Sequence, residues 1–376
     1  MLNPPPRSAY LHVPFCRHRC GYCNFSVVAG RLDLVDSFLE AISKELSLLG
    51  APQEVDTLYF GGGTPSQLTP TQLRQLCQLA LKWHPLADDY EWTVEANPSD
   101  VDRERLAVLA SHGVNRISLG AQSFRADKLK LLERDHLAAD ILQAVRLARE
   151  AGMHVAIDLI FAAPKETLLQ WQADLDEVLL LNPEHISTYG LTFEKGTTFW
   201  NRLAKNQLAQ LPEELERDMY LAAIDRLSLA GWEHYEVSNF ARPGQRSRHN
   251  EAYWSGRGYF AAGPGAARYV DGVRETNHRS TTTYLQRVLS GQSPIAEREC
   301  LDPVQRAREY LVFSLRRLEG VARNTFQEHT GKTLDELAGK DIARFVDEDM
   351  LADDGHTVRL TRAGLLVSDS LWPELL

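Results

Sequence analysis

Three cysteines within eight residues, Cys16, Cys20 and Cys23, are the residues of this chain best suited to carry chemistry. The spacing Cys-x₃-Cys-x₂-Cys places three thiolates on one short loop, close enough to bind three corners of a cubane iron–sulfur cluster. Such clusters usually take four cysteines. With three, the fourth iron keeps a vacant position that an exchangeable ligand can enter, as happens at open zinc sites. The motif therefore predicts a [4Fe–4S] cluster with one open iron.

A structural zinc site is the main alternative, with His12 or His18 as the fourth ligand beside the three cysteines. Zinc sites normally join one Cys-x₂₋₄-Cys pair to a distant second pair, but Cys77 and Cys300 stand alone in this sequence. An odd number of cysteines, clustered in this way, also argues for metal binding rather than disulfides. We therefore favour the cluster over zinc.

Strand-like and helix-like segments alternate six times through the first half of the chain. The predicted strands are Ala9–Val13, Thr57–Phe60, Trp92–Glu95, Arg116–Leu119, His154–Ile160 and His185–Tyr189. The predicted helices are Leu34–Leu49, Thr69–Trp83, Val101–Ser111, Ala138–Ala151 and Leu168–Leu181, and Gly or Pro marks several of their ends. This alternation predicts an α/β fold with parallel strands and right-handed crossovers, namely a partial (β/α)6 TIM-like barrel.

In such barrels the functional site lies at the C-terminal ends of the strands. The cysteines follow the first predicted strand, Gly61-Gly62-Gly63-Thr64-Pro65 follows the second, Glu95 ends the third and Gln122 follows the fourth. A glycine-rich loop lets the backbone approach a ligand closely. We therefore expect one barrel mouth to gather these residues.

Three regions are expected along the chain. Residues 1–200 form the barrel, and residues 201–299 contain a helix over Pro212–Ala230 and an aromatic, Gly-rich stretch over Trp232–Tyr269 that we expect to cover the barrel mouth. Residues 300–376 are expected to form a small C-terminal α+β module of winged-helix-like type, with a strand over Thr357–Leu360 and a last helix from Thr361.

Charge and hydropathy restrict the classes of partner. The formal net charge is −10, and no long Lys/Arg run is present, so we expect no nucleic acid to bind. No apolar stretch approaches the roughly 18 to 20 residues of a membrane span, and the opening residues lack the apolar core of a signal peptide. The sequence predicts a cytoplasmic protein that is not an integral membrane protein, and it does not indicate an oligomeric state.

The cysteine motif, with the aromatic Tyr22 before its third cysteine, resembles that of the radical S-adenosylmethionine (radical SAM) superfamily. The resemblance implies that S-adenosylmethionine chelates the open iron through its amino and carboxylate groups, and that the reduced cluster cleaves it to a deoxyadenosyl radical. It also implies an S-adenosylmethionine site made of Tyr10, Tyr22, Gly62, Gly63, Thr64, Glu95, Gln122, Arg134 and Asp158. Each of these residues also has a purely structural interpretation. Arg134 could be an exposed helix residue, Asp158 a salt-bridge partner or helix cap inside the barrel, and the two tyrosines ordinary core residues.

Further motifs narrow the resemblance to relatives of the oxygen-independent coproporphyrinogen III oxidase. Gly-x-x-Arg-x-Ser-x-Gly-x-Gln-Ser-Phe begins at Gly113 and Tyr-Glu-Val-Ser-Asn-Phe-Ala begins at Tyr235. That enzyme has another cysteine where this chain has Phe25, and it carries an N-terminal extension before its cysteine motif. Instead, the run His249-Asn250-Glu251-Ala252-Tyr253-Trp254 matches the His-Asn-x-x-Tyr-Trp motif of the HemW haem chaperones, a sister family.

The resemblance to HemW implies that His249, Asn250, Tyr253 and Trp254 bind haem. A neutral imidazole is a natural axial ligand of haem iron, and Arg246 or Arg248 upstream would suit the propionates. We therefore predict a haem carrier that delivers haem to haem-accepting proteins, with the cluster and S-adenosylmethionine in a regulatory or assembly role.

The alternative is a radical enzyme of porphyrin biosynthesis that oxidatively decarboxylates coproporphyrinogen III, so the sequence leaves open whether the protein is an enzyme. A radical enzyme that modifies RNA is a third possibility, which the acidic balance disfavours.

Overall fold

The computed structural model describes residues 5–376 and has an α/β architecture built on one nine-stranded sheet. Six neighbouring strands of this sheet are parallel: β1 (Ser8–Val13), β4 (Val55–Gly62), β5 (Leu86–Ala96), β6 (Arg116–Gln122), β7 (His154–Phe161) and β8 (His185–Gly190). Every predicted strand lies within the bounds of one of these six strands. The expected parallel α/β barrel-like sheet is confirmed.

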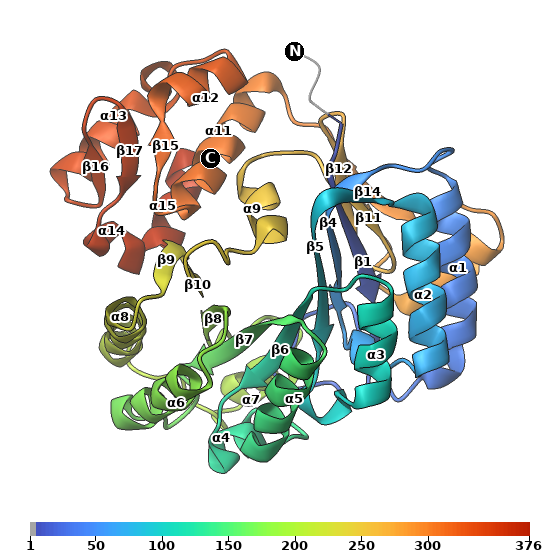
Figure 1. The fold of residues 1–376 in the computed structure, drawn as a ribbon. Coiled ribbons are helices and arrows are strands. Elements are labelled where there is room, and N and C mark those ends of the chain that lie inside the picture. Colours follow the sequence, from blue (N-terminus) through green and yellow to red (C-terminus); the bar gives the residue numbers. More distant parts are fainter. Residues whose placement is uncertain (1–4) are drawn as a thin grey trace.

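Helices cover one side of this sheet (Figure 1). They are α1 (Val35–Ser47), α2 (Pro70–Trp83), α3 (Arg103–Ser111), α5 (Ala138–Glu150), α6 (Leu168–Leu181) and α8 (Glu213–Leu229). The short helix α4 (Ala126–Leu131) follows β6, α7 (Thr198–Ala204) packs on the cysteine loop, and short 3₁₀ turns lie at Leu32–Leu34, Pro65–Gln67 and Pro98–Asp100. Thr69 and Thr167 begin α2 and α6 with capping boxes that satisfy the first free amide groups. The predictions missed α4 and α7, which are too short to show helical periodicity.

The central strands alternate between an apolar and a polar face. Ala9, Leu11 and Val13 of β1 belong to the main hydrophobic core beneath the helices. Because successive side chains of a strand point to opposite faces, the residues between them lie on the concave face. That face is polar and carries Ser8, Tyr10, His12, Thr57, Tyr59, Glu91, Glu95, Ser118, Asp158 and Ser187. The sheet therefore separates a helix-covered core from a face able to hold polar ligands.

The middle region contributes three further strands to the same sheet. β9 (Glu233–Glu236) and β10 (Asn239–Ala241) extend it antiparallel beyond β8, while β11 (Phe260–Ala262) pairs in parallel with β1 at the opposite edge. A separate sheet contains β12 (Ala267–Val270), β13 (Val273–Asn277) and β14 (Ile295–Glu299), and α10 (Thr281–Leu289) packs on α1.

A short helix of this region, α9 (Arg248–Trp254), lies on the concave side of the sheet (Figure 1). It contacts Thr57, which is close to the start of β4, and Glu91, which pairs with Thr57 on β5. The expectation that this stretch covers the barrel mouth is therefore wrong for α9, which lies toward the N-terminal strand ends. A later residue of the middle region, Arg279, does reach the mouth.

The C-terminal module has its own hydrophobic core. Its elements are α11 (Pro303–Arg316), β15 (Val321–Ala322), α12 (Arg323–Thr330), α13 (Leu334–Asp347), β16 (Leu351–Asp353), β17 (Thr357–Leu360), α14 (Arg362–Leu366) and α15 (Ser368–Leu375). The predicted strand coincides with β17, and α14 follows it as expected. The module joins the large sheet through Arg316, which donates two hydrogen bonds to the buried carboxylate of Glu236. Among residues 5–376, no helix combines the length and apolar character needed to cross a bilayer.

Candidate cluster and cofactor site

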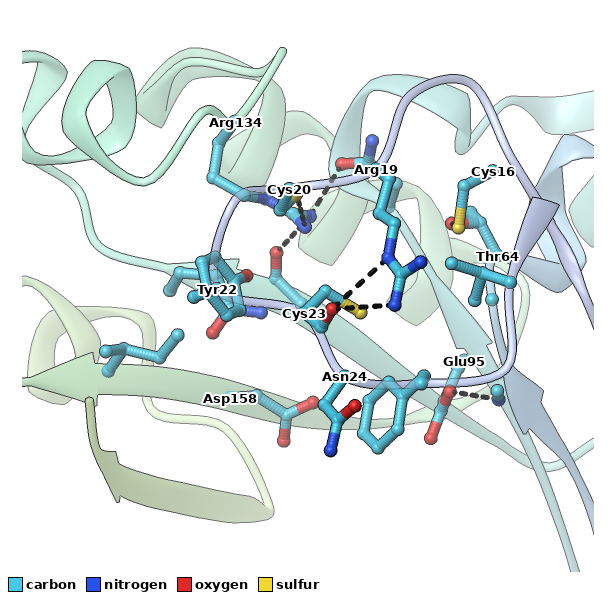
Figure 2. Close-up of a pocket in the computed structure, with 18 of the residues that line it drawn as sticks. Cys16, Arg19, Cys20, Tyr22, Cys23, Asn24, Thr64, Glu95, Arg134 and Asp158 are labelled. Atoms are coloured by element: carbon cyan, nitrogen blue, oxygen red, sulfur yellow. Dashed lines mark hydrogen bonds between the residues drawn. The ribbon is translucent and has the colours of Figure 1, made fainter. Parts of the chain in front are cut away.

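A cavity of about 660 Å³ opens at the C-terminal ends of the parallel strands (Figure 2). The structure brings together most of the predicted site residues around it: Cys16, Cys20, Tyr22, Cys23, Gly62, Gly63, Thr64, Glu95, Gln122, Arg134 and Asp158. Tyr10 does not line the cavity, because its hydroxyl group bonds Nδ1 of His12 at 3.0 Å, behind the glycine loop. The four residues of the His-Asn-x-x-Tyr-Trp motif do not line it either.

The loop after β1 carries the three cysteines and is held from two sides. The short strands β2 (Phe15–Cys16) and β3 (Val28–Ala29) pair at its ends, and the amide of Phe199 in α7 donates to the Gly21 carbonyl at 2.8 Å. Burial raises the pKa of the Cys16 thiol to about 11 and also raises the pKa of Cys23. These thiols stay protonated at neutral pH, so metal binding has to release their protons.

The arrangement of the thiols distinguishes a cluster from a single metal ion. Within residues 5–376, no three His, Cys, Asp or Glu side chains converge closely enough to hold one ion. His12 bonds Tyr10 and the Ser26 carbonyl through its two ring nitrogens, so it offers no free lone pair for zinc. A cubane cluster presents a separate iron to each cysteine, and three thiols spread around one cavity fit that requirement. The donor set therefore suits a cluster better than zinc.

Glu95 and the glycine loop form one unit at the floor of the cavity. The carboxylate accepts a hydrogen bond from the Tyr59 hydroxyl at 2.8 Å and another from the Gly62 amide at 2.9 Å. Burial raises the pKa of Glu95 to about 7. Gly62 has a φ of +105°, and a Cβ there would lie 2.3 Å from the His12 ring. Glycine is therefore required for the loop to lie against β1.

Asp158 lies across the cavity on β7 and bonds the Ser118 hydroxyl at 3.3 Å. Burial raises the pKa of Asp158 to about 6, so the concave face holds two carboxylates that protonate readily. Gln122 ends β6 in the left-handed region, with a φ of 65°. A residue held in that region is often fixed by its function, and here it turns toward the cavity.

Arg134 is a half-buried residue at the cavity wall rather than an exposed helix residue. Its Nη2 donates to the Gly120 carbonyl at 2.9 Å, and its Nη1 lies 3.5 Å from the Sγ of Cys20. A guanidinium at this place supplies positive charge next to the cysteine loop (Figure 2).

A buried ion cluster below the site was not predicted from the sequence. Lys128 bonds Glu166 at 2.5 Å and Asp174 at 3.1 Å, and Asp174 also accepts hydrogen bonds from Ser123 and the Phe124 amide. These contacts fix the chain directly after Gln122. Tyr59 was also missed, although its place two residues before Gly61 on an alternating strand puts it on the polar face.

His249 is in a second buried cluster, on the concave face below the cavity. Its Nδ1 bonds the Thr57 hydroxyl at 2.8 Å, its Nε2 bonds the Tyr253 hydroxyl at 2.9 Å, and its ring stacks on Tyr59 at 4.9 Å. The side chain is 1% exposed, and burial lowers its pKa to about 3, so the imidazole is neutral. Both ring nitrogens are therefore occupied in this conformation.

The other motif residues lie on the same helix, α9, and Tyr253 is the one that bonds this histidine. Tyr253 packs edge-on against Tyr259 at 4.6 Å, and Trp254 lies 6.2 Å from Tyr235. Ser247 caps the start of the helix, because its hydroxyl accepts a hydrogen bond from the backbone amide of Asn250. These residues are half-buried.

The two arginines expected to meet propionates already have carboxylate partners. Arg246 pairs with Glu233 and Glu319, and Arg248 pairs with Asp89 at 3.0 Å.

Comparison with known families agrees with this geometry. The profile of the Radical SAM superfamily matches residues 10–178, and that of the HemN C-terminal domain matches residues 301–367. Coproporphyrinogen III oxidase (HemN) from Escherichia coli superposes with a TM-score of 0.86 at 22% identity, over 99% of this chain and 90% of that chain. The fold is therefore a radical SAM fold with a HemN-type C-terminal module.

Relatives in sequence are more specific. The heme chaperone HemW of Bacillus subtilis is 33% identical over 97% of this chain and 98% of its own length, and that of Lactococcus lactis is 34% identical over 99% and 97%. A mitochondrial radical S-adenosyl methionine domain-containing protein 1 from Danio rerio is 34% identical over 98% of this chain. The chain belongs to the HemW family of radical SAM proteins. Membership of the superfamily implies a [4Fe–4S] cluster and S-adenosylmethionine.

Proposed function

We propose that this protein is a haem carrier that binds haem and transfers it to haem-accepting proteins, with a [4Fe–4S] cluster and exchangeable S-adenosylmethionine in a regulatory or assembly role. The observation that carries the proposal is the full-length similarity to the heme chaperone HemW of Bacillus subtilis. Phe25 supports it, because the side chain at this discriminating position is 64% exposed at the cavity rim and cannot ligate iron.

In this proposal Cys16, Cys20 and Cys23 ligate the cluster. The bound cluster supplies an open iron that chelates the amino and carboxylate groups of S-adenosylmethionine. Glu95 and the backbone carbonyls of the glycine loop would accept hydrogen bonds from the amino group and orient it. Tyr22, Gly62, Gly63, Thr64, Gln122, Arg134 and Asp158 line the rest of the cavity. Tyr10 acts from behind the loop by holding His12.

Haem binding is assigned to α9 through His249, Asn250, Tyr253 and Trp254. The neutral imidazole meets the chemical requirement for an iron ligand. Because both ring nitrogens are engaged, His249 has to leave Thr57 or Tyr253 before it can bind iron.

An anaerobic haem titration of cluster-loaded protein tests the proposal through the growth of the porphyrin absorption band. Wild type is expected to saturate near one haem per chain, and His249→Ala to bind at least about tenfold more weakly, a difference of about 1.4 kcal/mol. His154→Ala is the matched control, because His154 is exposed at the start of β7.

Tyr253→Phe sharpens the test, because it keeps the ring and removes the hydroxyl that holds Nε2 of His249. If release of the histidine limits binding, this variant takes up haem faster than wild type. If neither wild type nor Tyr253→Phe binds haem specifically, the carrier function is refuted. Conversion of coproporphyrinogen III by the same cluster-loaded protein would then assign the oxidase function, which the fold also accommodates.

A further inference from the structure

Two sites that lie far apart in the sequence meet on one side chain, that of Tyr59. Its hydroxyl donates to Oε1 of Glu95 at the floor of the cavity, at 2.8 Å. Its ring stacks on the imidazole of His249 with centroids 4.9 Å apart and an interplanar angle of 25°. One tyrosine therefore touches both the cavity residue that faces the cofactor and the histidine of α9.

Burial makes both contacts consequential. Glu95 has two hydrogen-bond donors, the Tyr59 hydroxyl and the Gly62 amide, in a region where burial disfavours its charged form. Loss of one donor from a buried carboxylate is costly, because hydrogen bonds to charged groups are stronger than those between neutral groups. The orientation of Tyr59 therefore affects how well Glu95 can serve as an ionised acceptor.

His249, the stacking partner of Tyr59, is also tightly packed. His249 is held between Thr57, Tyr253 and Tyr59, and its backbone amide donates to Glu91 at 3.1 Å. When His249 leaves this place, the Tyr59 ring loses the nearer of two ring partners and keeps only the more distant contact with Tyr10, at 6.0 Å between centroids. A stacked aromatic pair stabilises the relative orientation of its rings, so the Tyr59 ring then gains freedom to turn away from Glu95.

We propose that Tyr59 couples the cofactor cavity to α9, so that S-adenosylmethionine binding and outward movement of His249 oppose each other. The inference rests on the proposed function for the identity of the two ligands. Since such coupling is reciprocal, bound S-adenosylmethionine favours the inward position of His249 and promotes release of haem, and bound haem weakens the S-adenosylmethionine site. Tyr59 is a positioning residue that touches neither reacting centre.

The first experiment needs no haem. The affinity of cluster-loaded protein for S-adenosylmethionine is measured by equilibrium dialysis for wild type, Tyr59→Phe, His249→Ala and the double variant. Each single variant is expected to bind about fivefold more weakly, and the double variant no more weakly than either, because both changes break one pathway. Independent, multiplying losses in the double variant, or unchanged affinity in His249→Ala, overturn the proposal.

Tyr284→Phe is the matched control. Tyr284 also donates from a buried hydroxyl to a buried carboxylate, that of Glu45 at 2.5 Å, but it contacts neither the cavity nor α9. This variant is expected to retain wild-type affinity for S-adenosylmethionine. An equal loss in Tyr284→Phe refutes a specific role for Tyr59, because it attributes the effect to general destabilisation.

The second experiment adds haem. Saturating S-adenosylmethionine is expected to weaken haem binding by about fivefold or more in wild type and to have almost no effect in Tyr59→Phe. The same S-adenosylmethionine effect in both proteins overturns the coupling. If wild type binds no haem but the haem-free cycle shows a shared pathway, the carrier function fails and the role of Tyr59 stands.

Discussion

Replacing Arg134 by glutamine is expected to lower the reduction potential of the cluster. Nη1 of Arg134 lies 3.5 Å from the Sγ of Cys20, and the side chain is half-buried. The reduced cluster carries one more negative charge than the oxidised cluster, so a neighbouring cation stabilises the reduced form. Removing the guanidinium charge therefore makes reduction harder.

The magnitude follows from the distance. The iron bound to Cys20 would lie about 6 Å from the guanidinium, and two unit charges at that distance interact by roughly 3 kcal/mol at an effective dielectric constant of about 20. For a one-electron step, about 1.4 kcal/mol corresponds to about 59 mV. The full effect is therefore about 120 mV, and water at the open cavity reduces the expected shift to about 60 mV.

An anaerobic redox titration without S-adenosylmethionine, followed by the paramagnetic signal of the reduced cluster, measures this shift. Arg134→Lys keeps the charge and is expected to retain most of the wild-type potential. Arg202→Gln removes an exposed charge that pairs with Glu133 and controls for a general change in net charge. A potential in Arg134→Gln equal to that of wild type, or higher, refutes the electrostatic role.

Three further results are expected. Cys16→Ser, Cys20→Ser and Cys23→Ser each lose the cluster absorption while far-ultraviolet circular dichroism stays unchanged; a complete cluster in any of them contradicts the ligand assignment. Gly62→Ala lowers the thermal midpoint more than Gly50→Ala does, because both glycines have a positive φ but only the Cβ at position 62 meets His12. Burial raises the pKa of Glu95 from 4.5 to about 7. Wild type is therefore expected to lose stability relative to Glu95→Gln as pH rises from about 4.5 to 7, by up to about 1.4 kcal/mol per pH unit. Urea unfolding measures the free energy of unfolding of both proteins, and a difference between them that stays constant across this pH window would contradict that pKa.

The parallel strands and their main helices could be predicted from the sequence because each leaves a local pattern. Leu168–Leu181 was predicted with the bounds of α6, since Thr167 begins it and Pro183 follows its end. The strands β9 to β11 were missed because each has only three or four residues. Two of them also pair with strands far along the chain, β10 with β8 and β11 with β1.

The site shows the same limit. The cysteines, the glycine loop, Glu95 and Gln122 were predicted because they follow or end strands, where barrel geometry gathers them. Tyr22, Arg134 and Asp158 were predicted only from the resemblance to the radical SAM superfamily. The surroundings of His249 were not predicted, because its partner Thr57 lies 192 positions away and no local pattern reveals that contact. The sequence suggested that the His249 imidazole is free to bind iron, whereas in the structure both of its ring nitrogens are hydrogen-bonded. The regions 1–200, 201–299 and 300–376 remain a proposal, and strands of the middle region share the large sheet.

The joint between Glu236 and Arg316 determines whether this chain can be divided. Glu236 is 0% exposed, and the Arg316 guanidinium, which donates to it at 2.6 and 3.0 Å, belongs to the C-terminal module. A protein shortened before residue 300 would keep the carboxylate and lose its cation, and breaking a buried pair in this way costs about 3–5 kcal/mol. A protein shortened in this way is therefore expected to need Glu236→Gln, which removes the uncompensated charge, to keep its stability.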